Sequence, residues 1–176
     1  MVMAITWQHL YKITFRGDKT GHNPTDRSKL GSKRHILTDK NGIPLSTIIT
    51  SANTHDITIA TDTVDSIVIK RQLSSSSKSK HNQKKKQNLC LDKAYHSKEI
   101  EQEIIKRGYI PHIRHRREEK KIRQHHPSRR WVVERTNSWH NRFRKLFTRY
   151  EKKDENYLGL VQLANSLIVY RRLILR

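Results

Sequence analysis

Two carboxylates stand at positions where an enzyme can use an acid to hold a metal ion. Asp92 directly follows the apolar residues 89–91, and Glu134 lies in residues 129–136, whose spacing and charge predict a basic helix. A carboxylate at a strand end and another on a later helix, in a chain of net charge +21, predict a metal site that acts on phosphodiesters. Two cations placed for in-line displacement at phosphorus need at least three carboxylates, and no third acid has a comparable position.

The positive charge is spread along the whole chain and predicts a polyanionic partner. There are 37 Lys and Arg against 16 Asp and Glu, and basic residues recur from Lys12 to the last residue. That spread favours a nucleic-acid-binding surface over a basic tail. A ribosomal or nucleoid protein without catalytic activity has the same kind of charge, so charge alone leaves both classes open.

Cysteine usage and hydropathy predict where the protein works. Cys90 is the single cysteine, so no disulfide forms within the chain and a reducing compartment is expected. No apolar run approaches the ~20 residues that a membrane span needs, and the first residues lack the basic segment of a signal peptide. We expect a cytoplasmic protein at the chromosome, with no membrane partner.

The order of strand and helix patterns predicts an α/β fold. Strands are expected at 34–38 and 44–50, a helix that begins at 53–56, a flexible basic loop at 73–87, a strand at 88–91, a helix at 97–107 and a strand at 109–113. Asn41-Gly42 is a strong signal for a hairpin between the first two strands. Strand, helix and strand over 88–113 predict a parallel pair with a right-handed crossover.

The last third of the chain is predicted to be helical. A long helix is expected at 128–150, with an apolar face formed by Trp139, Phe143, Leu146 and Tyr150. A second face holds Arg130, Glu134, Asn137 and Asn141. Arg130 and Glu134 alternatively form only an exposed ion pair, worth about 0.3–0.5 kcal/mol. A closing helix at 156–176 is expected to bury Tyr157, Leu160, Val161, Ala164, Leu167 and Ile168.

A cluster of histidines offers a weaker alternative site. Residues 114–126 are almost entirely charged or His, and His112, His115, His125 and His126 lie in or next to this segment. No cysteine accompanies them and their spacing matches no closed zinc site, so solvated loop histidines are the better interpretation.

Four segments together resemble a known family. Residues 23–39, 52–56, 91–95 and 130–136, the last followed by Arg-Phe-Arg-Lys at 142–145, resemble the DDE transposases of bacterial insertion sequences, most closely the insertion sequence 5 family. The resemblance covers residues 20 to 173. It implies a ribonuclease-H-like mixed sheet flanked by helices, formed by residues 20–176. Residues 1–19 are atypical of the family, and residues 1–16 do not look like its first strand, which we expect to be missing or substituted.

The resemblance also implies roles for individual residues. Asp92 matches the family's second catalytic aspartate and Glu134 its glutamate, and together they would bind two Mg²⁺ (or Mn²⁺) ions in the intact enzyme. The partners would be transposon ends and target DNA, with a homo-oligomer assembled on DNA at the bacterial nucleoid. Contacts to DNA phosphates are expected from Arg27, Lys29, Lys33, Arg34, Lys93, Arg130, Arg135, Arg142 and Lys145.

The chain departs from the family pattern at three positions. The first catalytic aspartate would fall near Trp7, where no acid occurs, and Asp18, Asp26 and Asp39 are poor substitutes. Pro127 stands where the family has a tyrosine, and Asn141 where it has a lysine. His55 and Asp56 are typical of the family, and we interpret them as a helix cap and not as metal ligands.

These departures leave three hypotheses. In the first hypothesis, the chain is a transposase catalytic domain that is inactive on its own. It is either encoded as the second of two overlapping frames and completed by the upstream product, or it is a decayed copy. Alternatively it is a DNA-binding regulator or remnant that occupies transposon ends, or a general basic nucleic-acid protein. Only the first predicts that Asp92→Ala and Glu134→Ala abolish metal binding and leave DNA affinity unchanged or raised.

Overall fold

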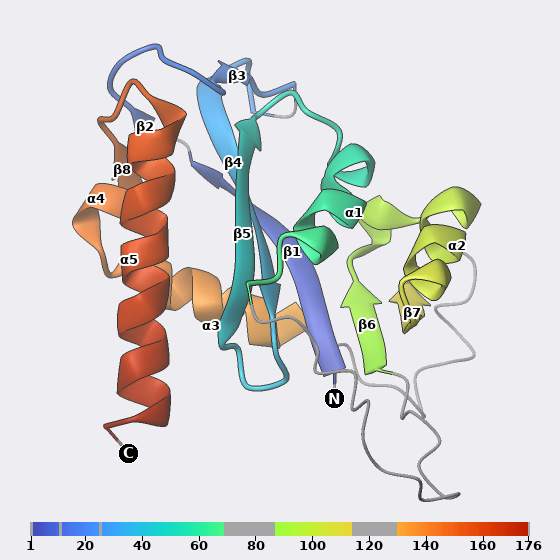
Figure 1. The fold of residues 1–176 in the computed structure, drawn as a ribbon. Coiled ribbons are helices and arrows are strands. Elements are labelled where there is room, and N and C mark those ends of the chain that lie inside the picture. Colours follow the sequence, from blue (N-terminus) through green and yellow to red (C-terminus); the bar gives the residue numbers. More distant parts are fainter. Residues whose placement is uncertain (1, 11, 25, 69–86, 114–129, 176) are drawn as a thin grey trace, which may run out of the picture.

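The fold is built on one mixed sheet with helices on both faces (Figure 1). The computed structural model describes the chain except residues 1, 11, 25, 69–86, 114–129 and 176. At residues 2–10, 12, 93 and 130 it describes the backbone but not the side chains. The strands of the main sheet are β1 (Val2–Leu10), β3 (Gly21–His22), β4 (Leu30–Thr38), β5 (Pro44–Ser51), β6 (Gln87–Leu91) and β7 (Tyr109–Ile113). Both predicted strands of the hairpin and both predicted parallel strands are therefore present.

The strand order places β1 at the centre of the sheet. β4 pairs antiparallel with β1 and β5, whereas β6 pairs parallel with β1 and β7. Short β3 pairs with the start of β4. Three antiparallel strands followed by two parallel ones, with the first strand in the middle, confirm the expected ribonuclease-H-like mixed sheet.

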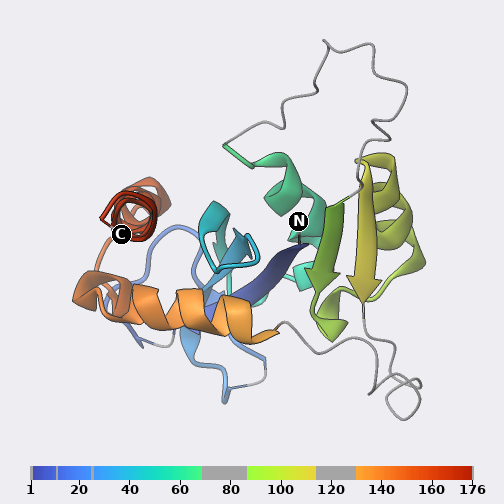
Figure 2. The same cartoon turned by 90° about the horizontal axis from the view of Figure 1, so that it is seen from below.

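The helices divide between the two faces of this sheet (Figure 2). α1 (Asp56–Asp65), the 3-10 turn η1 (Lys93–Tyr95) and α2 (Lys98–Lys106) share one hydrophobic core with β4 and β6. α3 (Arg130–Asn141) packs on β1 and β4 from the opposite side. α4 (Arg144–Phe147) and α5 (Asp154–Leu173) form a second core with β5. β2 (Lys12–Ile13) and β8 (Thr148–Arg149) make a small separate parallel pair.

The hairpin between β4 and β5 forms as its sequence predicts. The Asp39 carboxylate accepts hydrogen bonds from the backbone N–H groups of Asn41 and Ile43, each at 2.8 Å. Gly42 adopts φ 83°, a left-handed conformation that glycine adopts at little cost. The turn is thus specified locally and fixes the register of the two strands.

Residues 2–10 correct the expectation about the N-terminus. They do not lie outside the fold or leave the first strand missing, since they form β1 in the middle of the sheet. β1 is paired on both edges, with Trp7 opposite His35 of β4 and Ile5 beside Leu91 of β6. Residues compatible with β structure form a strand when they lie between two such neighbours. A first strand is therefore present, and the expectation that it is missing is wrong.

The single helix expected over 128–150 is also corrected. Helix α3 ends at Asn141, α4 is one short turn, and residues 148–149 are extended. The buried guanidinium of Arg149 explains the break, because it donates to Ser32 Oγ, the Asp18 carbonyl and the Glu151 carbonyl at 2.8–2.9 Å. These tertiary bonds require extended backbone where the helical periodicity continues. Tyr150, expected on the buried face, is 55% exposed.

Candidate active site and DNA-binding surface

Asp92 lies where a parallel strand ends. It follows β6 directly, is half-buried, and its carbonyl accepts the Tyr95 N–H at 3.0 Å, which closes the turn η1. Because Ile5 of β1 is in register with Leu91 of β6, the backbone of Thr6 and Trp7 continues past this strand end. The predicted position of Asp92 at a strand terminus is therefore what the structure shows, next to the middle of β1.

A buried hydrogen-bond chain supports the turn that follows Asp92. The Tyr95 side chain is 1% exposed, with its hydroxyl 3.3 Å from Nδ1 of His35, whose Nε2 is 2.8 Å from Thr50 Oγ1. Burial raises the pKa of Tyr95 well above its usual value, and the negative charges of Asp56 and Asp92 add to the shift. Tyr95 therefore stays neutral and ties the turn to β4 and β5.

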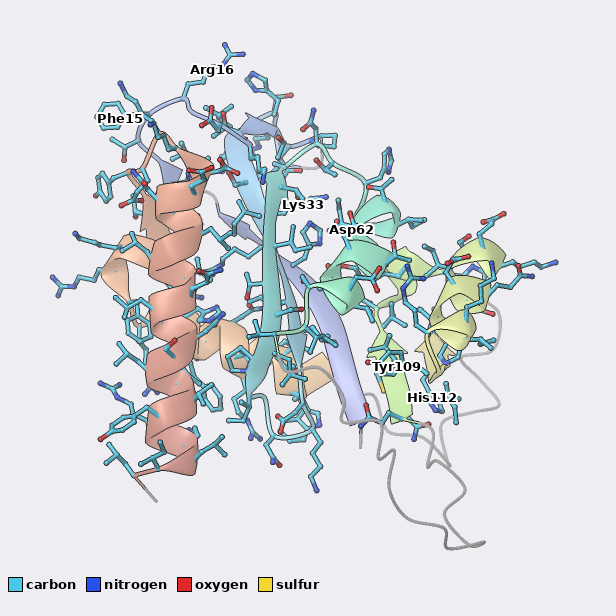
Figure 3. The ribbon with its side chains drawn as sticks, in the orientation of Figure 1. Phe15, Arg16, Lys33, Asp62, Tyr109 and His112 are labelled. Carbon is cyan, nitrogen blue, oxygen red and sulfur yellow. The ribbon has the colours of Figure 1, made fainter. Side chains whose placement is uncertain are left out.

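Lys33 lies inside the fold, between β4 and the start of α1 (Figure 3). Its Nζ donates to Asp56 Oδ1 at 3.0 Å and to the Thr54 carbonyl at 2.8 Å, and the two charged side chains are 10% and 12% exposed. Asp56 therefore serves as an ion-pair partner, and His55, the N-cap residue of α1, makes no side-chain capping bond. Lys33, expected to contact DNA phosphate, offers little surface here.

Arg34 is buried on the opposite face of β4. Its Nη2 donates to Asn141 Oδ1 at 3.3 Å, and burial lowers its pKa. His140 lies close by, and burial together with the Arg34 charge lowers the pKa of His140 to about 4. The ring of His140 is 2.7 Å from Asn165 Oδ1 on α5. The C-terminal half of α3 is thus anchored by a polar cluster, and Arg34 is not at the surface.

Glu134 lies on the exposed side of α3. The opposite side is held by buried Val132 and Val133, and by Thr136, whose hydroxyl donates to the Gly42 carbonyl at 2.6 Å. In Figure 2 the N-terminal end of α3 lies toward β6. The hydrogen bond between Thr136 and Gly42 therefore fixes α3, and with it Glu134, against the β4–β5 hairpin.

The candidate DNA-binding surface consists of exposed cations in two regions, the loop before β4 and the α3–α4 region. These cations are Arg27, Lys29, Arg135, Arg142, Arg144 and Lys145, while nothing is described of the side chains of Lys93 and Arg130. The guanidinium of Arg135 lies 4.3 Å from the centre of the exposed Trp131 ring. A hollow of about 300 Å³ is lined by Asn141, Arg144, Lys145, Phe147, Thr148 and Tyr150.

Sequence reasoning missed the aromatic part of this surface. Phe147 and Tyr150 are 53% and 55% exposed beside Arg144 and Lys145. Exposed aromatic rings interleaved with cations are typical of surfaces on which nucleic-acid bases stack. The helical periodicity placed Tyr150 in the core, and only the break after α3 turns it outward.

The described residues do not fit a two-ion metal centre. Among the described residues, no three His, Cys, Asp or Glu side chains form a group that could hold a metal ion. β1, which passes the end of β6, contains no acid. Asp39 is engaged by the hairpin amides and Asp56 by Lys33, so neither is available as the third ligand beside Asp92 and Glu134.

The histidine alternative gains no support from the described part of the chain. His112 lies on β7 (Figure 3) with Nε2 3.0 Å from Asn88 Oδ1 of the neighbouring strand. His115, His125 and His126 lie outside the described residues, as do residues 73–86 of the expected basic loop. None of the described helices is long and apolar enough to cross a membrane.

Comparison with known proteins gives consistent relatives. The family model described as "Transposase DDE domain" matches residues 8–169. The putative transposase for insertion sequence element IS402 of Burkholderia cepacia is 37% identical over 159 residues, which are 88% of this chain and 70% of that protein. Among solved structures, the piggyBac transposase in a synaptic complex with hairpin DNA matches with a TM-score of 0.46 and 13% identity. That match covers 96% of this chain and 46% of the piggyBac chain.

Proposed function

The chain belongs to the transposase DDE domain family, and from this premise we propose that it acts in insertion-sequence transposition by binding transposon DNA. The family implies end cleavage and strand transfer with divalent metal ions, Mg²⁺ or Mn²⁺. We propose that this chain does not carry out those steps alone, because the described residues bring no third carboxylate to Asp92 and Glu134. Its narrower placement in the insertion sequence 5 group stays a prediction.

The observation that carries the proposal is the family match over residues 8–169 of 176, together with a net charge of +21. Positively charged side chains neutralise DNA phosphates, and the release of counterions from the DNA drives binding. The exposed cations Arg27, Lys29, Arg135, Arg142 and Lys145 would contact phosphates and set the orientation of the DNA. Phe147 and Tyr150 would stack on bases that leave the duplex.

A DNA-binding test distinguishes this proposal from a general basic protein. Fragments that flank the coding sequence would be compared with shuffled fragments of the same composition across a salt series. We expect tighter binding to the terminal fragments, and a logarithm of the affinity that falls linearly with the logarithm of salt concentration. Arg142→Ala with Lys145→Ala should reduce the slope by about 2, whereas Lys33→Ala should leave it unchanged. Equal affinity for all fragments would show a general basic protein.

A gain-of-function substitution tests why the chain would be inactive. Trp7 lies opposite His35 in β1, which passes the end of β6 where Asp92 stands. If only the first carboxylate is missing, Trp7→Asp should produce Mg²⁺- or Mn²⁺-dependent nicking of terminal fragments, and Asp92→Asn should abolish it. Trp7→Asn is the matched control, because it introduces the same shape without the charge.

A second candidate function is favoured by the incomplete carboxylate set. A chain that binds ends without cleaving them would act as a regulator that occupies transposon ends. End-specific binding with no nicking by Trp7→Asp would favour the regulator over a domain that lacks one residue. Robust strand transfer by the unmodified chain would overturn the proposed lack of activity.

A further inference from the structure

Helix α5 carries two apolar stripes, one buried in the fold and one largely exposed. Tyr157, Val161, Ala164 and Ile168 are buried against the sheet and α4. A second stripe runs along the helix at Leu160, Leu163, Leu167, Tyr170 and Ile174. Leu160 packs in part against the inner core, and the other four side chains are 59%, 37%, 46% and 66% exposed. At 100° per residue this outer stripe lies roughly 110° around the helix from the buried one.

The outer stripe has the spacing of a helix-pairing surface. Its members are separated by three, four, three and four residues, which is the a and d pattern of a coiled-coil seam. Leu167 was expected in the core, but its side chain lies at the surface. Gly159 flanks the seam, and no atom lies within 4 Å of the position that its Cβ would take. A second helix therefore has room to approach closely.

The charge distribution excludes DNA as the occupant of this stripe. Residues 156–170 contain no Asp, Glu, Lys or Arg, in a chain of which 30% is charged. A surface that binds phosphates needs cations, and a contiguous exposed apolar stripe is typical of a protein interface. The two internal segments outside the description, 69–86 and 114–129, are strongly basic in sequence and do not match an uncharged apolar seam.

A second copy of the chain fits the seam. Two molecules of charge +21 repel each other, and an approach along α5 brings together residues 156–170, which are uncharged. In an antiparallel pair, Leu163 of one copy meets Leu167 of the other and Leu160 meets Tyr170, so every contact occurs twice. The acidic first turn of one copy, which includes Glu155, then faces the basic last turn of the other copy, which includes Arg171. The dipoles of the two helices run in opposite directions.

We propose that the outer stripe of α5 is a homodimer interface, in which two copies pack antiparallel through Leu160, Leu163, Leu167 and Tyr170. The interface does not depend on the proposed DNA function, because it uses none of the cations assigned to DNA. It lies on the far side of the sheet from α1 and α2 (Figure 2).

Sedimentation equilibrium of the DNA-free protein tests this interface. We expect a species of twice 20.9 kDa, and Leu163→Glu with Leu167→Glu should raise the dimer dissociation constant by roughly 100-fold or more. Gln162→Glu is the matched control, because it adds the same side chain on an exposed position of the same helix away from the stripe. Circular dichroism and retained DNA binding would show that the double variant is folded.

Cross-linking checks the geometry of the pair. On a Cys90→Ser background, Ser166→Cys beside the seam should cross-link with a short bis-maleimide, and Gln162→Cys should not. A monomeric wild-type protein at 100 μM, or a double variant that dimerises like the wild type, would overturn the proposal. Equal cross-linking at both positions would overturn the antiparallel α5 pairing. None of these results bears on DNA binding, so the two proposals fail separately.

Discussion

Replacing Gly42 with alanine should destabilise the protein at the point where the hairpin holds α3. Gly42 has φ 83°, and a non-glycine residue in left-handed backbone costs about 1–2 kcal/mol. The added methyl group would lie 3.1 Å from Thr136 Oγ1 and 3.2 Å from the Val132 carbonyl oxygen. Shifting α3 to relieve that contact would weaken the Thr136–Gly42 hydrogen bond, worth about 0.5–1.5 kcal/mol.

The two costs together predict a loss of about 2–3 kcal/mol in the free energy of unfolding. For a domain of this size the melting temperature should fall by roughly 5–10 °C. Urea and thermal unfolding followed by circular dichroism measure both quantities. Glu134 stands two residues before Thr136, so the same shift displaces the proposed catalytic carboxylate.

A double-mutant cycle separates the backbone cost from the contact with α3. In a Thr136→Ala background the hydroxyl that meets the new methyl group and its hydrogen bond to Gly42 are already gone, and of the close contacts only that with the Val132 carbonyl oxygen remains. Gly42→Ala should therefore cost less than in the wild-type background, about 1–2 kcal/mol for the left-handed backbone. Gly42→Asn should lie between wild type and Gly42→Ala, because asparagine tolerates left-handed backbone but has the same Cβ. A cost below about 0.5 kcal/mol, or an equal cost in both backgrounds, would refute the reasoning.

Two further predictions concern buried ionisable groups. The pKa of His140 is lowered from 6.5 to about 4, so the unfolded state binds its proton first as the pH falls. Stability should be intact above pH 6.5 and fall by about 3 kcal/mol in total toward pH 4, and His140→Gln should flatten that window in urea titrations. Asp56→Asn removes the carboxylate from the 10%-exposed Lys33 ammonium and should cost about 1–3 kcal/mol. Restoration by Lys33→Met in the same background would identify the buried charge as the cause, and a cost below 0.5 kcal/mol would contradict it.

Local signals were sufficient for the elements that local chemistry specifies. Asn41-Gly42 predicted the β4–β5 turn, and the structure shows Asp39 and the left-handed Gly42 closing it. The short apolar run at 89–91 predicted a buried strand at 88–91, directly before Asp92, and β6 ends at Leu91. In each case the residues that decide the conformation are neighbours in sequence.

Two elements could not be predicted because distant residues decide them. β1 was not expected from its own residues, and it is held as the central strand by its pairing with β4 and β6, which lie far along the chain. The helix expected over 128–150 stops because Arg149 is drawn to Ser32 and the Asp18 carbonyl, more than 100 positions away. Helical periodicity alone contains no information about such bonds.

Two of the cations expected at a DNA surface, Lys33 and Arg34, are buried because of the geometry of their strand. Lys33 and Arg34 are neighbours on β4, and their side chains point to opposite faces, as successive residues of a strand do. Because helices cover both faces of this central strand, both cations are buried, Lys33 beside Asp56 and Arg34 beside Asn141. The sequence shows their charge but not the layer above them.

Because these cations are buried, the formal net charge overestimates the positive charge that can contact DNA. Lys33, Arg34 and Arg149 count toward the formal +21, yet each is less than 9% exposed and hydrogen-bonded within the fold. The salt dependence of DNA binding counts only cations that release counterions from phosphates. It should therefore respond to the exposed residues of the loop before β4 and the α3–α4 region, and not to these three. The net charge of such a domain overstates its DNA-binding surface whenever its central strand is basic and covered on both sides.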